Sequence, residues 1–169
     1  NEEFIKKIVG SLEKVGSDIC FANTKMIQDK INPLRYSLTY NEICRYQYLG
    51  DHMSKALEKY LATVKPGMTE YEITGGVAGA LWPEQIGQVL FLAAADERIL
   101  KHRHAIPTTN KLEKCLMLSC NGRYKGLITT TTRMVYFGSP PASLLQYYDD
   151  AAEVECRMIA ATKPGVDDL

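Results

Sequence analysis

The sequence predicts an α+β protein in which an antiparallel β-sheet is covered by helices on one face. The first observation is a hairpin pattern, because apolar and polar residues alternate through Cys115–Cys120 and a β-branched run follows Gly126. The second is a pair of capping boxes, each of which opens a helical segment earlier in the chain. The third is an apolar stretch, Gln88–Ala95, that predicts a buried strand ahead of the hairpin.

The first part of the chain predicts short elements. Residues 2–15 place their apolar side chains on one helical face and predict a helix. Residues 18–22 predict a short strand, and Asn32-Pro33 predicts a break in the chain.

Two longer helices follow in the predicted order. Their N-cap and N3 residues form the two capping boxes, Thr39 with Glu42 and Thr69 with Glu72. The first helix is expected over residues 40–64 and the second up to about residue 81. Gly75, Gly76 and Gly79 inside the second helix predict close packing on the sheet, since glycine otherwise costs helical stability.

The remaining elements are a loop at residues 101–110, the hairpin, a turn at residues 138–141 and a last helix over residues 142–162. The loop contains polar and basic side chains. The last helix ends in Lys163-Pro164-Gly165, which resembles the Lys65-Pro66-Gly67 that ends the first long helix. Such an ending is also a common signal for the C-terminus of a helix, so chance repetition is an alternative explanation.

Composition excludes several function classes. The chain has 169 residues, of which 46% are hydrophobic, so it can bury one core. Its 20 basic and 20 acidic residues cancel, which argues against a nucleic-acid or anionic-membrane surface. No stretch has the apolar length of a membrane span. Five cysteines are an odd number without a CxxC pair, which favours reduced thiols and a cytoplasmic location.

The hairpin resembles a known metal-binding hairpin. Its Arg123-Tyr-Lys-Gly126 turn and its Thr132-Arg133 pair are similar to the first such hairpin of the pita-bread hydrolases, which include methionine aminopeptidase, Xaa-Pro aminopeptidase, prolidase and creatinase. The peptidases of this superfamily have two metal-binding Asp residues there, and the same register puts Ser119 and Thr130 at those positions. A pair of divalent metals needs anionic oxygen ligands, so no metal ligand and no cofactor are predicted for this chain.

The resemblance also implies a domain organisation. Residues 36–169 are expected to form the first half of a pita-bread catalytic domain, with the second half absent. On this view Val166–Leu169 begin a helix that matches the one after Gly67. Residues 1–35 are expected to be the tail of an N-terminal creatinase-type domain, or a linker.

A second resemblance is to creatinase, which has this fold without metals and uses a His as a proton shuttle. Its His-x-Pro-x-Thr-Asn segment is similar to His104-Ala-Ile-Pro-Thr-Thr-Asn110, with one extra residue before Pro107. An imidazole can take a proton from water and return it to a leaving amine. Arg103 and Arg133 are the predicted partners of a substrate carboxylate. The alternative is that these are solvated loop residues.

The sequence therefore predicts a protein like Xaa-Pro dipeptidases and aminopeptidases that does not bind the dinuclear metal and is inactive as this chain. Two alternatives remain, a metal-free creatinase-like C–N hydrolase in the intact protein and a non-catalytic peptide-binding or interaction module. The expected partner is a peptide or a small amino-acid-like substrate. A homodimer is expected as well, since half a domain leaves apolar surface and an unpaired sheet edge.

Overall fold

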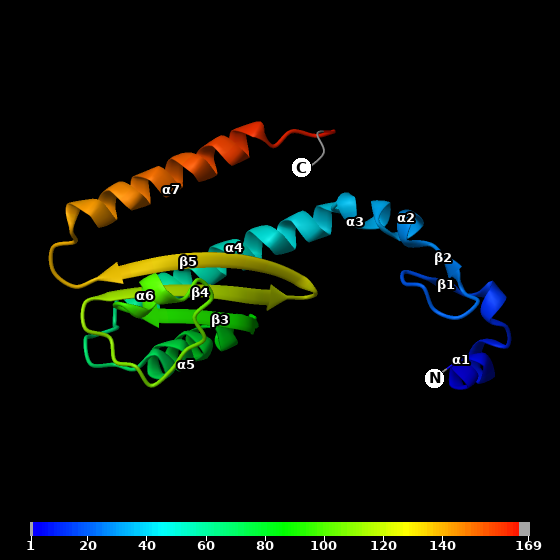
Figure 1. Ribbon diagram of the computed structural model, residues 1–169, viewed down its shortest axis with the longest axis horizontal. Coiled ribbons are helices and arrows are strands. Elements are labelled where there is room, and N and C mark those ends of the chain that lie inside the picture. Colours follow the sequence, from blue (N-terminus) through cyan, green and yellow to red (C-terminus); the bar gives the residue numbers. More distant parts are fainter. Residues whose placement is uncertain (1, 166–169) are drawn as a thin grey trace. The chain divides into compact units, whose positions relative to one another are not determined.

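A computed structural model describes residues 2–165 and divides the chain into two compact units, Asn1–Gln47 and Tyr48–Leu169 (Figure 1). The division falls inside the long helix α4, Tyr40–Leu61. The predicted origin of residues 1–35 stays a prediction. The predicted helix start at Val166–Leu169 lies outside the described residues. No helix in residues 2–165 is long and apolar enough to cross a membrane.

The first unit consists of short elements. They are α1 (Glu2–Val9), η1 (Leu12–Lys14), β1 (Gly16–Ser17), β2 (Lys25–Met26), α2 (Gln28–Ile31) and α3 (Pro33–Tyr36). The predicted helix over residues 2–15 is too long, because Gly10 adopts φ +78° and ends α1 in a left-handed conformation. The predicted strand at residues 18–22 is wrong, since that segment forms the connection between β1 and β2, which pair in parallel.

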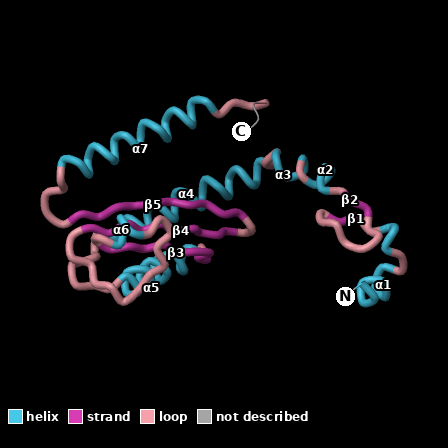
Figure 2. Tube along the Cα trace, viewed as in Figure 1, coloured by secondary structure: helices cyan, strands magenta, loops and turns pink. Residues whose placement is uncertain are grey.

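The second unit contains a three-stranded antiparallel sheet in the order β3-β4-β5 (Figure 2). Its further elements are α5 (Glu70–Leu81), η2 (Trp82–Glu84), β3 (Gly87–Ala95), α6 (Arg98–Lys101), β4 (Cys115–Tyr124), β5 (Leu127–Tyr136) and α7 (Ala142–Ala161). Lys125 and Gly126 join β4 to β5 with φ values of +45° and +87°. Two positive φ values suit the tight turn of a two-residue hairpin.

Both predicted capping boxes are present. The Thr69 hydroxyl accepts a hydrogen bond from the Glu72 N–H at 3.1 Å, and the Glu72 carboxylate accepts one from the Thr69 N–H at 2.7 Å. Thr39 and Glu42 make the same exchange at 3.3 and 2.7 Å. Each exchange satisfies two N–H groups that a helix N-terminus otherwise leaves without a partner.

Helices α4 and α5 cover one face of the sheet, as the sequence predicted. Helix α4 buries a residue at every fourth position, namely Leu49, Met53, Leu57 and Leu61. They pack in one core with residues of α5 and with Leu116, Leu118 and Cys120 of β4. Burial raises the pKa of the Cys120 thiol to about 12, so this thiol stays protonated and acts as a small core residue.

The glycines of α5 only partly match the prediction. A Cβ atom at Gly76 would overlap the ring of Tyr60 on α4, whereas one at Gly75 or Gly79 would meet nothing within 4 Å. The close approach is therefore between two helices at one position, and not between the helix and the sheet. A comparable close approach to the sheet occurs at Gly122 of β4, where an added Cβ would lie 2.5 Å from the Met53 sulfur.

Candidate functional site on the open face of the hairpin

The hairpin has one face toward the helices and one open face. In β4 the buried positions are Leu116, Leu118, Cys120 and Gly122, and the residues between them point the other way. The open face therefore carries Ser119 and Asn121 from β4, with Thr132 and Thr130 directly opposite them in β5. The two positions that the sequence singled out, Ser119 and Thr130, thus lie on the same face in diagonal register.

The side chains of this face are neutral hydrogen-bonding groups. The hydroxyl oxygens of Ser119 and Thr132 lie 2.6 Å apart and share a hydrogen bond. Asn121 faces Thr130 across the hairpin and adds an amide. Asn121 and Thr132 were not singled out from the sequence, because only the pairing of the strands shows which residues lie beside Ser119 and Thr130.

A cavity of about 610 Å³ lies between β5 and α7, next to this face. Its lining consists of Thr130, Thr131, Thr132, Arg133, Met134, Tyr148, Ala151, Ala152 and Glu155. The size is in the range of small-molecule and peptide sites. The lining is mostly hydroxyl and aliphatic, with Arg133 from β5 and with a phenol and one carboxylate contributed by α7.

The residues of this face do not fit a pair of divalent metals. Hydroxyl and amide groups carry no charge, and two divalent cations need several anionic ligands. Among the residues that the structure describes, no three His, Cys, Asp or Glu side chains lie close enough to hold a metal ion. Glu155 is the carboxylate that lines the cavity, and it belongs to α7 and not to the hairpin.

Arg133 lies on the opposite face from Ser119 and Thr130. Its Nε and Nη2 donate to Oε1 of Glu58 on α4 at 3.0 and 2.7 Å. Its Nη1 donates to the Thr131 hydroxyl at 2.6 Å. The guanidinium is thus engaged with the helix layer, while Arg133 is also among the residues that line the cavity. The predicted contact of Arg133 with a substrate carboxylate stays a prediction.

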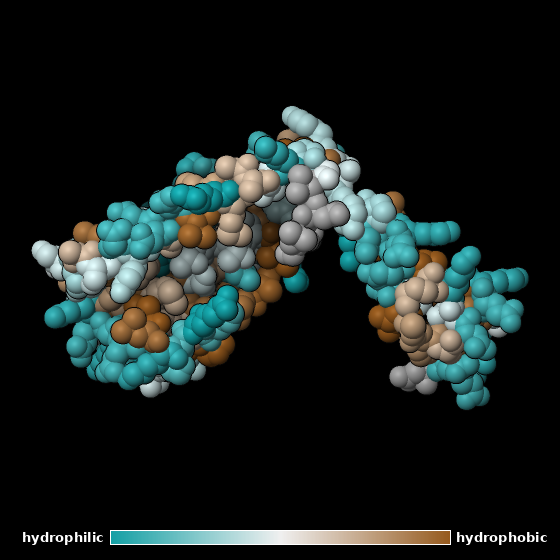
Figure 3. Space-filling model, turned by 45° about the horizontal axis from the view of Figure 1, so that its top comes forward, coloured by the Kyte–Doolittle hydropathy of each residue, from teal (hydrophilic) through white to brown (hydrophobic). Residues whose placement is uncertain are grey.

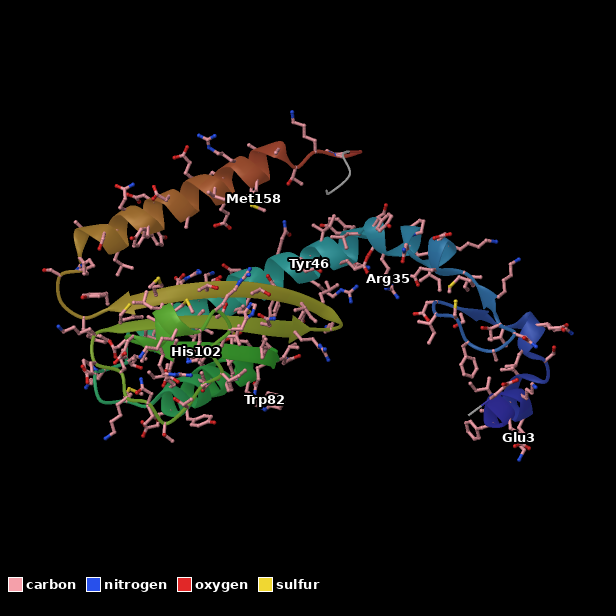
Figure 4. The ribbon with its side chains drawn as sticks, viewed as in Figure 1. Glu3, Arg35, Tyr46, Trp82, His102 and Met158 are labelled. Atoms are coloured by element: carbon pink, nitrogen blue, oxygen red, sulfur yellow. The ribbon has the colours of Figure 1, made fainter. Side chains whose placement is uncertain are left out.

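The loop with Arg103 and His104 follows the outer edge of β3. The Ala93 N–H donates to the Ala105 carbonyl at 2.8 Å, which places this loop on the side of β3 away from β4. Arg103 and His104 are exposed, as is the neighbouring His102 (Figure 4). Because β5 is at the other edge of the sheet, the structure does not bring His104 together with the hairpin residues. The predicted catalytic role of His104 stays a prediction.

A buried carboxylate that the sequence did not single out holds the same loop in place. Glu70 at the start of α5 is fully buried and accepts hydrogen bonds from the Ala95 N–H at 2.8 Å and from the Thr108 N–H and hydroxyl at 2.8 and 2.9 Å. Arg98 forms an ion pair with it. Its partners lie at least 25 residues away in the chain, so the residues around Glu70 carry no local signal for this arrangement.

Asp96 has a structural role at the start of β4. Its carboxylate accepts hydrogen bonds from the N–H groups of Glu113, Lys114 and Cys115 at 2.8, 2.8 and 2.9 Å. Partial burial works to raise the pKa of Asp96, but the bonds from Cys115, Glu113 and Lys114 outweigh it, so the pKa is lowered. The carboxylate is therefore a poor candidate for a general acid near neutral pH.

The fold belongs to the pita-bread class. Over 97% of this chain, the structure resembles an X-Pro aminopeptidase from Thermotoga maritima with a TM-score of 0.78 and 19% identity. A prolidase from Pyrococcus furiosus matches over 85% of this chain with a TM-score of 0.76 and 22% identity. The matched parts are 52% and 43% of those two chains, so the structure corresponds to about half of a pita-bread protein.

The sequence comparison gives the family. Residues 45–167, more than half of the chain, match the model of metallopeptidase family M24, and the chain belongs to that family. An uncharacterized peptidase of Staphylococcus saprophyticus is 26% identical over 147 residues, which are 83% of this chain and 41% of that protein. The chain thus spans about half the length, or less, of the relatives that it matches.

Proposed function

We propose that this chain is an Xaa-Pro peptidase-like member of family M24 that does not hold a dinuclear metal and does not hydrolyse peptides by itself. One observation carries the proposal, namely the neutral Ser119 and Thr130 on the open face of the hairpin, where the resemblance to the family expects metal-binding carboxylates. The structural matches are an X-Pro aminopeptidase and a prolidase, and they supply the substrate class of the proposal.

The physical reason is charge. A dinuclear centre brings four positive charges, and a site without carboxylates cannot offset the loss of their hydration. The Ser119 hydroxyl is also engaged with Thr132 at 2.6 Å. Metal-assisted hydrolysis requires a metal-bound water as the nucleophile, and a site that does not hold the metals cannot supply one.

The same face is suited to binding without chemistry. Hydroxyl and amide groups can donate to and accept from a peptide backbone, and the adjoining cavity of about 610 Å³ has room for a short peptide or an amino-acid-like ligand. The described residues are therefore suited to bind a ligand, which needs no metal. The activity and the substrates of a longer protein that contains this chain are likewise proposals.

The test is metal titration of the chain, with Mn²⁺ followed by calorimetry and by metal analysis after dialysis. The chain should retain less than one equivalent, and it should not cleave an Xaa-Pro dipeptide in the presence of Mn²⁺. The double variant Ser119→Asp with Thr130→Asp should gain measurable Mn²⁺ affinity, because it supplies two carboxylates on one face.

The matched control is Ser119→Asn with Thr130→Asn, which has nearly the same shape without charge and should bind no more metal than the original chain. Stoichiometric metal in the original chain, or turnover of the dipeptide, would overturn the proposal. An Asp variant that gains no affinity over the Asn variant would show that these positions are not the family's metal-binding pair.

Metal-free C–N hydrolysis through His104 is the alternative. Two observations weigh against it, the exposed position of His104 and its location beyond the outer edge of β3, away from the cavity at β5. A His104→Ala variant of an active longer protein would decide the matter, since retained turnover would exclude the imidazole as the proton shuttle.

A further inference from the structure

Residues 98–110, which we call the strap, follow β3, form α6 and return along the outer edge of β3 before β4 begins. All residues of the strap are described, and only Ala105 and Pro107 among them are buried. Leu100 and Ile106 are 90% and 60% exposed, and the surface of the larger unit shows apolar patches between hydrophilic ones (Figure 3). Because alanine and proline bury little apolar area, apolar packing within this chain contributes little to holding the strap.

The polar contacts of the strap converge on one buried carboxylate. Oε2 of the fully buried Glu70 accepts hydrogen bonds from the Thr108 N–H and hydroxyl at 2.8 and 2.9 Å and forms the ion pair with Arg98. Its Oε1 accepts a hydrogen bond from the Ala95 N–H of β3 at 2.8 Å. Arg98 in turn donates to the Ile106 carbonyl at 3.0 Å. One side chain of α5 thus joins the end of β3, α6 and the returning part of the strap.

The backbone at the start of α5 adds two further bonds to the strap. The first two N–H groups of this helix donate to the carbonyls of Asn110 and Thr108 at 3.0 and 3.2 Å. A helix leaves such N–H groups without a partner of its own. The capping box of Thr69 and Glu72 closes the same turn without any residue of the strap. Release of the strap therefore leaves α5 capped, and water can take over its two exposed N–H groups.

Both ends of the strap are anchored without Glu70. At one end, the Asp96 N–H donates to the Cys115 carbonyl at 2.7 Å, and the Asp96 carboxylate accepts from the three N–H groups of residues 113–115. At the other end, Leu112 is buried and its N–H donates to the Met68 carbonyl at 2.9 Å. The strap is thus a surface loop whose ends lie close together and stay fixed when its middle is released.

We propose that Glu70 and Arg98 form a clasp that holds the strap closed, and that the strap opens as one unit while the sheet, α4 and α5 stay folded. The reason for a single step is charge. A buried carboxylate needs its donors, so loss of Arg98 or Thr108 leaves a charge that the remaining bonds do not offset, and they are lost together. Once the strap is open, water reaches the carboxylate and replaces the donors. Because the strap carries Arg103 and His104, the clasp decides whether these two side chains have a fixed position.

The test is amide hydrogen exchange of the full chain at neutral pH, measured by mass spectrometry on peptides from the strap, α5 and β4. Glu70→Gln removes the charge at nearly constant shape. It should raise the exchange rate of the strap peptides at least about tenfold and that of the β4 peptides less than about twofold. The matched control is Glu72→Gln, the same change two residues further along α5, where the carboxylate accepts from Thr69 and not from the strap. It should change the strap's rates by less than about twofold.

A second variant, Thr108→Val, tests the clasp from the side of the strap. It removes the hydroxyl that donates to Glu70 and that accepts from the Asn110 N–H at 3.1 Å, and it keeps the side-chain volume nearly constant. The strap's exchange rates should rise by about threefold to tenfold, less than in Glu70→Gln. Because this variant keeps the ion pair of Glu70 with Arg98, it tests the clasp even if Glu70→Gln does not fold. Urea denaturation of each variant measures its global stability.

Each outcome bears on a stated part of the proposal. Faster exchange that is confined to the strap supports it. Equal acceleration in the strap, α5 and β4 would overturn the separate opening, because the strap would then unfold with the core. Unchanged strap rates in Glu70→Gln and Thr108→Val would overturn the clasp. A strap that already exchanges like an unfolded peptide in the original chain would show that it is not closed at all. None of these measurements involves metal binding or activity, so the proposed function stands or falls separately.

Discussion

The two faces of the β3-β4-β5 sheet share one backbone but differ in the burial and the chemistry of their side chains. On the helix face, Leu116, Leu118 and Cys120 of β4 are fully buried beneath α4 and α5. On the open face, Met134 and Ile128 of β5 are 41% and 40% exposed, and Ser119 and Thr132 bond to each other. The strands alternate between these faces at every residue, so adjacent positions experience opposite environments.

Stability depends mainly on the helix face, whereas the proposed function depends on the open face. The helix face accounts for most of the apolar burial in the larger unit, and apolar burial is the main stabilising term of a folded domain. The open face contributes little burial and is free to carry polar groups. The hydroxyl groups of Ser119 and Thr130, at the positions proposed to correspond to the family's metal-binding carboxylates, are therefore compatible with this fold.

The largest difference is expected between Leu57→Ala and Met134→Ala. Leu57 of α4 is fully buried, so its truncation leaves a cavity and should lower the free energy of unfolding by about 2–5 kcal/mol. Met134 is 41% exposed on the open face, and its truncation should cost less than about 1 kcal/mol. Urea denaturation of both variants measures the contrast. Similar losses would mean that the open face is also part of a core, for instance through another chain.

Two adjacent residues of β4, Gly122 and Asn121, allow the two faces to be compared within one strand. Gly122 faces the helices, and an added Cβ would lie 2.5 Å from the Met53 sulfur and 3.0 Å from Ile86. Gly122→Ala should therefore destabilise by about 1–3 kcal/mol through overpacking. Asn121 faces the open side, and Asn121→Ala should change stability by less than about 0.5 kcal/mol. If alanine at position 122 were neutral in thermal unfolding, the contact between α4 and β4 would be looser than the structure indicates.

The contribution of Asp96 to stability should depend on pH. Asp96 binds the start of β4, the strand whose residues alternate between the two faces. Backbone donors lower the pKa of Asp96 in the folded chain, against the opposing effect of its partial burial. Its contribution to stability is therefore complete above the ordinary Asp range near about 4 and is lost as the pH falls through the lowered native value. Asp96→Asn should cost about 1–3 kcal/mol at pH 7, because both carboxylate oxygens accept N–H groups and the asparagine NH2 cannot accept in place of one of them. Asparagine tolerates the native φ of +54°, so no backbone strain is added.

The control for this effect is the same pair of chains, the original and the Asp96→Asn variant, at a pH below both pKa values of the carboxyl group. There the difference between their unfolding free energies should shrink, because the carboxyl of the original chain is then protonated in both the folded and the unfolded state. A constant difference from neutral to strongly acidic pH would contradict the proposed charge dependence.

The smallest effect is expected on the open face itself. Ser119→Ala removes one hydroxyl of the pair with Thr132, but water can replace the lost partner on an exposed surface. The expected loss is less than about 0.5 kcal/mol in urea denaturation. A loss above about 1.5 kcal/mol would show that this hydroxyl pair has a structural role, and the binding interpretation of the face would weaken accordingly.

Local signals were predictive where a few neighbouring residues decide the conformation. The capping boxes at Thr39 and Thr69 place the starts of α4 and α5, and the turn at Lys125-Gly126 places the hairpin. The same reasoning failed at residues 18–22, where β-branched and aromatic content predicts a strand that the structure does not form. Short segments have weak propensities, and tertiary contacts override them.

The sequence by itself determined the fold class, the two long helices α4 and α5, the β4-β5 hairpin and the neutral side chains at Ser119 and Thr130, because each depends on residues close together in the chain. Only the tertiary structure decided that Arg133 points to Glu58 and that the His104 loop lies beyond β3. It also revealed the buried Glu70 and its partners from distant parts of the chain. These features depend on which strands pair and which helix faces find a partner, and such long-range contacts leave no local pattern to recognise.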